Sequence, residues 1–320
     1  MALHTPPDGR VGTAYRSDGA PRSGVAASVP LMRAREVLRG VTPPYVADAL
    51  RRVRSRNAQP QPTWEYVGTT WVDEGAGDGW NADTVATAYA RKLPEFRAAI
   101  AVPNCIGVPT EALLGCSANQ YDQNIALGYG YAVARAASGR ARVSILDWGG
   151  GFGYMALVVR ELFPDVDFDF HVKEVPSTAR AARDIVEGVT FWDDDSCLDR
   201  TYDLVSACGS FQYSPDWRAQ LARLGGAARF FVLTRTPVAM TPSSFVVRQH
   251  AYGTSYVGWV FSRDELLGGA DAAGLFLERE LLEGWSANVP GAPARDEHRG
   301  YVFSNRSALA SEGSVSSSVI

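Results

Sequence analysis

Residues 142–153 read RVSILDWGGGFG, and this stretch decides the fold. The apolar run over 143–146 predicts a buried strand, and the glycines after it predict a tight turn into a helix. Such a turn lets the backbone approach a ligand closely. The helix that follows offers unpaired N–H groups and the positive end of its dipole. The stretch therefore predicts a binding site for a carboxylate or phosphate at the end of a strand.

The spacing of the glycines separates three classes of nucleotide site. A dinucleotide fingerprint G-x-G-x-x-G that begins at Gly149 and Gly151 requires a glycine where Tyr154 stands. A P-loop requires Gly-Lys followed by Ser or Thr, and the sequence lacks it. What remains is an acid, Asp147, followed by glycines at alternate positions up to Gly153. This pattern is typical of enzymes that bind S-adenosylmethionine.

Outward from this loop, strand-like and helical patterns alternate along the chain. The alternation predicts an α/β fold, a Rossmann-like doubly wound sheet that is mostly parallel. Strand-like segments at 275–283 and 300–306 predict a final pair with one antiparallel strand, which completes a seven-stranded sheet. The first half is mostly helical in pattern. We therefore expect a disordered tail over 1–30, a helical N-terminal extension or lid over 31–138, a Rossmann-like catalytic domain over 139–306 and a flexible tail over 307–320.

The composition limits the classes of partner and the location that we expect for the protein. The formal charge is −4, which gives no electrostatic reason to expect nucleic acid. The four cysteines show no CxxC spacing, so neither a metal site nor a disulfide framework is expected. No stretch approaches the run of about 20 apolar residues that spans a membrane, and no secretory signal is recognised. A cytoplasmic protein without stable membrane insertion is expected, and a homodimer stays open. A basic amphipathic helix over 45–56 fits either a docking helix or a membrane-surface contact.

Further candidate cofactor-binding residues follow the neighbouring predicted strands. Glu174 ends the second strand about 20 residues after the loop, where a carboxylate can bond ribose hydroxyls. The third strand runs into Asp193 and Asp194, which could accept a hydrogen bond from an adenine amino group. The fourth runs into Cys208 and Gly209, expected beside the sulfonium. The full predicted cofactor set is Asp147, Gly149, Gly150, Gly151, Gly153, Glu174, Asp193, Asp194, Cys208 and Gly209.

These features together resemble class I S-adenosylmethionine-dependent methyltransferases. More narrowly, they are similar to a poorly characterised bacterial group of that family, over roughly residues 40–305. The segments that carry the narrower resemblance are TPPYVADALRRV (42–53), LDWGGGFG (146–153), YDLVSACGSFQY (202–213), LTRTP (233–237) and VVRQHAYGTSYVGWVFSRDELL (246–267). The resemblance implies the fold and S-adenosyl-L-methionine as cofactor, but it does not specify the acceptor.

Methyl transfer needs alignment of nucleophile and methyl group, and a base where the nucleophile carries a proton. His250 is the candidate base, because it lies in a polar, aromatic segment after the fifth strand, and Tyr213 could position the nucleophile. A structural role is the alternative for both. The candidate acceptor-binding residues are Gln212, Arg235, Arg248, Tyr252, Tyr256 and Trp259.

Methyl transfer to a small-molecule acceptor, such as a sugar or natural-product intermediate, is therefore the expected function, with the O, N or C acceptor atom open. Two alternatives remain at this stage. One is an enzyme of the same fold that catalyses an elimination or cyclisation. The other is a non-catalytic binding protein with a degenerate site.

Overall fold

The computed structural model describes residues 63–72, 78–102 and 119–309 of the 320-residue chain. The chain divides into two compact units, Met1–Asn57 and Ala58–Ile320, and every described residue belongs to the second. The expected tail over 1–30 and the basic helix over 45–56 lie outside the described residues. So does most of the tail over 307–320.

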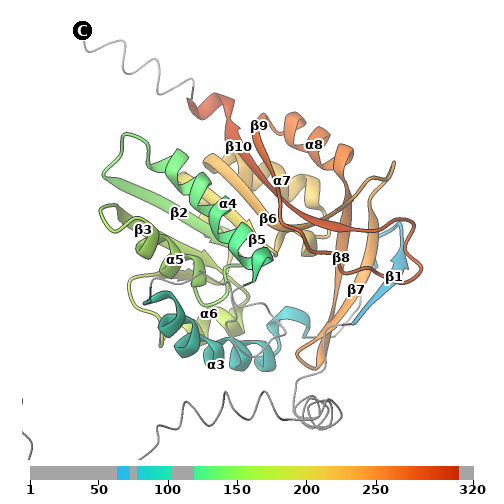
Figure 1. The fold of residues 1–320 in the computed structure, drawn as a ribbon, viewed down its shortest axis with the longest axis horizontal. Coiled ribbons are helices and arrows are strands. Elements are labelled where there is room, and N and C mark those ends of the chain that lie inside the picture. The colour runs from blue at the N-terminus through green and yellow to red at the C-terminus, as the bar shows by residue number, and fades with distance from the viewer. Residues whose placement is uncertain (1–62, 73–77, 103–118, 310–320) are drawn as a thin grey trace, which may run out of the picture. The chain divides into compact units, whose positions relative to one another are not determined.

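The centre of the described unit is the expected Rossmann-like α/β sheet. Seven strands follow one another in the order β4–β3–β2–β5–β6–β10–β9 (Figure 1). β10 is antiparallel to both its neighbours, and the other pairs are parallel, which confirms the predicted final strand pair. The bounds are β2 Arg142–Trp148, β3 Asp167–Lys173, β4 Thr190–Trp192, β5 Tyr202–Cys208, β6 Ala228–Ala239, β9 Leu275–Leu282 and β10 Glu297–Asn305.

Helices cover both faces of this sheet, because its strands are apolar on both sides. Ile145 and its neighbour Leu146 on β2 point to opposite faces and are both fully buried, each in a different core cluster. The first cluster packs against α3 Asp83–Ile100, α4 Gln120–Ala137, α5 Tyr154–Leu162 and α6 Pro176–Arg183. The second packs against α7 Trp217–Gly226 and α8 Arg263–Ala272.

Three further strands extend the sheet beyond the predicted seven. The hairpin β7 Phe245–Ala251 and β8 Thr254–Ser262 joins the far end of β6, where Val238 pairs with Phe261. β1 Thr63–Gly68 adds antiparallel to β7 and forms the outer edge (Figure 1). The expected helical extension therefore contains a strand, which is a correction. β1 is short and lies at the edge of the sheet, and its Trp64 and Tyr66 alternate with Thr63 and Glu65 as in a half-buried strand.

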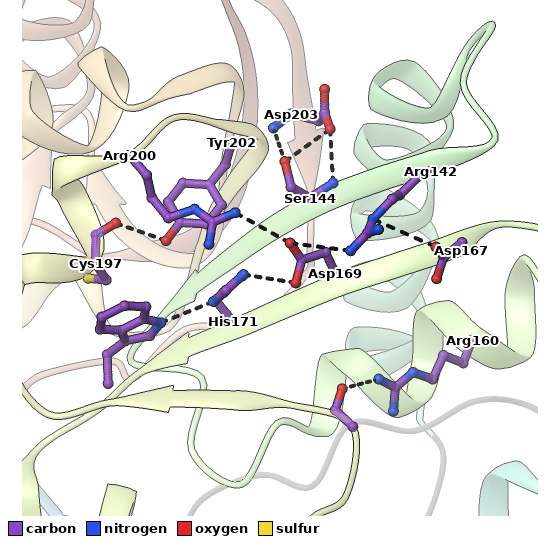
Figure 2. Close-up of polar contacts among 12 residues, drawn as sticks. Arg142, Ser144, Arg160, Asp167, Asp169, His171, Cys197, Arg200, Tyr202 and Asp203 are labelled. Carbon is purple, nitrogen blue, oxygen red and sulfur yellow. Dashed lines mark hydrogen bonds and ion pairs between the residues drawn. The ribbon is translucent and has the colours of Figure 1, made fainter.

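Polar contacts tie the central strands together at some distance from the loop of residues 149–153. Asp203 on β5 accepts hydrogen bonds from the backbone N–H and the hydroxyl of Ser144 on β2, at 2.9 and 3.0 Å (Figure 2). On β3, His171 lies between Asp169, 3.0 Å away, and the indole N–H of Trp192, at 3.1 Å. Burial lowers the pKa of His171. These contacts give His171, in the middle of β3, a structural role.

No helix among the described residues is long and apolar enough to cross a membrane.

Candidate functional site

A cavity of about 610 Å³ opens at the carboxyl ends of β2, β3 and β5. In an open parallel sheet, ligands bind at this edge, where the connections from adjacent strands run to opposite faces. The connections from β2 and β5 do so here, through α5 and α7. The cavity is lined by Trp80, Tyr89, Trp148, Gly149, Lys173, Glu174, Val175, Asp195, Gly209, Ser210, Tyr213, Ser214, Pro215, Asp216, Ala219, Gln220 and Arg223.

The glycine loop forms the floor of this cavity. Gly149 lines it with a φ of 70°, and its N–H donates to the carbonyl of Lys173 at 2.8 Å. A Cβ atom at Gly149 would lie 2.3 Å from the Cβ of Ser210, so only glycine fits between the two strand exits. Gly151 and Gly153 also have positive φ, and Gly153 is the N-cap of α5. The loop conformation therefore accounts for glycine at these alternate positions.

Asp147 lies beneath the loop and outside the cavity lining. Its side chain is fully buried, and its Oδ1 accepts a hydrogen bond from Ser206 at 2.7 Å. Burial raises the pKa of Asp147 to about 7. A Cβ at Gly150 would lie 2.4 Å from Asp147 Oδ2, which explains the additional glycine. This position supports a role of Asp147 in orienting the loop and not the cofactor contact expected from the sequence.

Glu174 connects the second strand to the glycine loop. Its Oε1 accepts the N–H of Gly151 at 2.8 Å, and its Oε2 accepts the N–H of Val175 at 2.9 Å. The side chain is 8% exposed, and it lines the cavity. A carboxylate with two lone-pair sites per oxygen can keep these bonds and still accept from a ligand hydroxyl. Glu174 is therefore available to a ligand hydroxyl in the cavity.

The aspartate after β4 that lines the cavity is not one of the two that were predicted from the sequence. Asp193 pairs with Arg183 at 3.2 Å, and Asp194 caps the short 3-10 helix η2 Asp195–Asp199 by accepting the N–H of Ser196. Neither lines the cavity. Asp195 does, and its carboxylate lies 2.7 Å from Arg223 and 3.8 Å from Lys173. The third aspartate of the run therefore faces the cavity, because the first two are used by local contacts.

Some of the residues at the end of β5 line the cavity, and others are buried in the protein interior. Gly209, Ser210 and Tyr213 line the cavity, whereas Cys208 does not. Burial raises the pKa of the Cys208 thiol to about 12, so the thiol stays protonated. The side chain of Gln212 is 6% exposed and donates to the carbonyl of Gly209 at 2.9 Å. Gln212 thus braces the turn that includes the short 3-10 helix η3 Phe211–Tyr213 and does not line the cavity.

Aromatic rings form the wall of the cavity next to the β7–β8 hairpin. Trp80, in the short 3-10 helix η1 Gly79–Asn81, stacks on Tyr256 with ring centroids 3.9 Å apart and meets Tyr213 edge-on at 4.9 Å. Tyr252, with a φ of 54°, lies 6.4 Å from Trp80. Trp259 lies apart from this group, donating to a backbone carbonyl and packing on Trp71. Of these rings, Trp80 and Tyr213 line the cavity, whereas Tyr252, Tyr256 and Trp259 lie outside its lining.

The hydroxyl of Tyr213 has a structural partner. It donates to Gln249 Oε1 at 2.6 Å, and Gln249 is 4% exposed. We expect Tyr213→Phe to lower the free energy of unfolding by about 1–3 kcal/mol, because a buried acceptor loses its donor. Denaturant unfolding measures this, with Tyr131→Phe on exposed α4 surface as the control. An unchanged unfolding free energy would show that the hydroxyl serves the ligand rather than the fold.

His250 and Arg248 lie on the other face of β7. Side chains alternate along a strand, so these two residues point away from the buried Gln249 between them. Arg248 pairs with Glu65 on β1, and this contact lowers the pKa of Glu65. His250 is 46% exposed at its side chain, and its Nε2 lies 3.8 Å from Glu65. Neither residue lines the cavity, and this placement does not support the catalytic role expected for His250 or the acceptor-binding role expected for Arg248.

Several residues that line the cavity were not selected from the sequence. Trp148 and Lys173 stand immediately beside the glycine loop and Glu174, and their side chains contact each other, with the ammonium 4.5 Å from the ring centroid. Their position at strand exits was a usable signal. Trp80, Tyr89 and Arg223 come from segments far away in the sequence and carry no local signal. Among the described residues, no group of three or more His, Cys, Asp or Glu side chains could hold a metal ion.

No protein-family model matches the sequence, and no curated protein matches it. Similar solved structures include the N-terminal domain of EvdMO1 with SAH bound, at 16% identity over 67% of this chain and 97% of that chain, with a TM-score of 0.42. Another is CalS10, an amino pentose methyltransferase from Micromonospora echinaspora, at 20% identity over 59% and 92%, with a TM-score of 0.39.

A third similar structure is described as a pericyclic reaction enzyme. It is 14% identical over 54% of this chain, with a TM-score of 0.38, and the match spans 47% of that chain's length. At these levels of similarity, the function has to be argued from the geometry of the site.

Proposed function

We propose that the protein binds S-adenosyl-L-methionine in this cavity and transfers its methyl group to a small molecule. The observation that carries the proposal is that the glycine loop and an acidic side chain contact each other at one cavity. The glycine loop and the Glu174 carboxylate meet through the Gly151 N–H at the edge of the sheet where ligands bind. The cavity volume of about 610 Å³ lies in the range of small-molecule sites.

Each part of the site has a role in this proposal. Glu174 accepts the ribose hydroxyls, and Gly149 lets the amino-acid end of the cofactor approach the backbone closely. Gly209 and Ser210 lie beside the sulfonium, and the aromatic rings of Trp80 and Tyr213 line the same cavity. The bound cofactor supplies an activated methyl group, so the protein chiefly aligns the two reactants.

The experiment that tests the proposal is calorimetric titration of the purified protein with S-adenosylmethionine and S-adenosylhomocysteine. We expect saturable binding with a stoichiometry of one, and S-adenosylhomocysteine as product when an acceptor is turned over. The second readout separates methyl transfer from an elimination or cyclisation that leaves the cofactor intact. Absence of binding by the wild-type protein would refute the proposal.

The aspartates after β4 provide a finer test. We expect Asp195→Asn to weaken cofactor binding about two- to fivefold, because partly exposed ion pairs with Arg223 and Lys173 at the cavity are lost. Asp193→Asn also removes an ion pair but faces away from the cavity, and it should leave the affinity unchanged. The same titration measures both. A larger loss in Asp193→Asn would assign the adenine end of the site to the wrong aspartate.

We also propose that the acceptor is a sugar or a natural-product intermediate of a bacterial biosynthetic reaction, and that the enzyme works in the cytoplasm without nucleic acid. The net charge of −4 and the aromatic rings of Trp80 and Tyr213 in the cavity lining support this. A homodimer is compatible with this function.

A further inference from the structure

A second group of polar side chains lies next to the cavity and is not used by the proposed cofactor site. We call it the Arg235 cluster. It gathers residues from the start of α4, the end of β5, the middle of β6 and the segments at the ends of β9 and β10. Its members are Tyr121, Asp122, Cys208, Arg235, Glu283 and His298.

Arg235 stands at the centre of this cluster. It has a φ of 54°, and its backbone N–H donates to both carboxylate oxygens of Glu283, at 2.8 and 3.0 Å. The hydroxyl of Tyr121 lies 2.6 Å from His298 Nδ1. Burial raises the pKa of Asp122 to about 6 and that of Glu283 to about 7, while the guanidinium acts in the opposite direction on both. Burial, and to a lesser degree Arg235, holds the pKa of His298 well below its usual value.

Two buried polar atoms of the cluster have no protein partner. Asp122 is 3% exposed and His298 is 8% exposed, yet Asp122 Oδ1 and His298 Nε2 make no hydrogen bond. The other ends of both groups are held: Asn119 donates to Asp122 Oδ2 at 2.7 Å, and Tyr121 contacts His298 Nδ1. Buried polar groups in native proteins are normally satisfied, so two oriented and unsatisfied atoms in one cluster indicate a ligand.

The cluster adjoins the cofactor cavity at Gly209. A Cβ at this glycine would lie 3.3 Å from Arg235 Cβ and 3.5 Å from its Nε, so the arginine side chain packs directly behind the cavity lining. Cys208 pairs with Thr234 in the register of β5 and β6. The cluster therefore stands beside the proposed place of the sulfonium, where an acceptor must lie for in-line transfer.

Charge indicates what kind of acceptor fits. The cluster contains one guanidinium and two carboxyl groups, and its imidazole is neutral. The arginine is therefore balanced within the protein, which disfavours a phosphate or carboxylate group on the acceptor. An unsatisfied carboxylate oxygen instead accepts a hydrogen bond from a hydroxyl or amino group.

We propose that the Arg235 cluster is the acceptor subsite, and that it binds a neutral hydroxyl or amino group whose hydrogen is accepted by Asp122 Oδ1. This inference rests on the proposed function. In the reaction, a lone pair on the acceptor oxygen or nitrogen forms the new bond to the methyl carbon. The carbon–sulfur bond breaks, its electron pair goes to sulfur, and the acceptor proton passes to the Asp122 carboxylate. His298 Nε2 provides a second hydrogen bond that orients the acceptor.

The test uses the complex of the full chain with S-adenosylhomocysteine and two probes of similar size. Catechol is a neutral hydroxyl donor and benzoate is an anion. Nitrogen NMR of histidine-labelled protein reports on His298, whose signals are assigned by their loss in His298→Asn. We expect catechol to shift the His298 signals and benzoate to leave them unchanged.

Two variants test the role of Asp122. Asp122→Asn keeps the size of the side chain and removes the proton acceptor, and it should weaken catechol binding about tenfold or more. Asp83→Asn, an exposed acid in the first turn of α3, is the matched control and should bind catechol like the wild type. Neither variant should change the affinity for S-adenosylhomocysteine, and thermal unfolding checks that both are folded.

Several results would overturn the inference. They are a shift of His298 with benzoate rather than catechol, no shift with either probe, or equal catechol binding by Asp122→Asn. A large loss of S-adenosylhomocysteine affinity in Asp122→Asn would place this residue in the cofactor site instead. Failure of the wild-type protein to bind S-adenosylhomocysteine is a different outcome, because it refutes the proposed function itself.

Discussion

Replacing Glu174 with glutamine will lower the affinity for S-adenosylmethionine by about 10- to 100-fold. The carboxylate accepts two backbone N–H groups, from Gly151 and Val175, and it lines the cavity. A glutamine amide has one oxygen and one NH₂ group, so one of the two backbone donors would face another donor. The contact of the loop with residue 174 would be weakened, although the Gly149 N–H would still donate to Lys173 on β3, and the ribose would lose its charged acceptor.

Calorimetric titration of Glu174→Gln measures this loss, with Glu187→Gln as the control. Glu187 is an exposed acid after α6, and its replacement changes the net charge equally without touching the cavity. The thermal midpoint of each unliganded variant separates a damaged fold from a damaged site. Equal affinities for Glu174→Gln and the control would remove Glu174 from the binding site.

Replacing Gly149 with alanine will have the second large effect, on both stability and binding. The new Cβ would meet the Cβ of Ser210 at 2.3 Å, and the residue would keep a φ of 70°, which an L-residue adopts at a cost of about 1–2 kcal/mol. Together these terms should lower the free energy of unfolding by about 2–4 kcal/mol. Because the loop must move to relieve the contact, S-adenosylhomocysteine should no longer raise the thermal midpoint of the variant.

Two further variants separate the energetic cost of the positive φ from that of the contact with Ser210. Gly139 has a φ of 73° and open space around its Cβ position, so Gly139→Ala carries the backbone cost alone, about 1 kcal/mol. The double variant Gly149→Ala with Ser210→Gly removes the colliding atoms and should recover the difference. If Gly139→Ala proves as destabilising as Gly149→Ala, the close approach to Ser210 is not what fixes glycine at 149.

The sequence predicted the central sheet well, because the strands that carry it are buried on both faces and read as continuous apolar runs. VSILDW and YDLVSAC stood out for this reason, and β2 and β5 match them closely. The strand β1 was missed. It is an edge strand whose partner β7 lies far away along the chain, and the local signal that was overlooked is the alternation of Trp64 and Tyr66 with Thr63 and Glu65.

The residues of the candidate site that directly follow a strand could be predicted from the sequence, because the strand ends determine where they lie. Gly149 and Glu174 follow strands directly, so strand ends placed them in the cavity. His250 shows where this reasoning stops, because one step along β7 decides whether a side chain faces the interior or Glu65. His298 was not selected from the sequence, because its contact with Tyr121 exists only in the folded protein.

The carboxylate beneath the loop also bears on how this sequence can diverge. Asp147 occupies the space into which any side chain at 150 would project, at 2.4 Å from the position of its first carbon. In descendants of this chain, the two positions should therefore change together or not at all. A lineage that keeps the aspartate must keep glycine at 150, and one that shortens the acid releases its neighbour from this constraint. The middle glycine of the run, Gly150, is then best understood as half of a co-inherited pair.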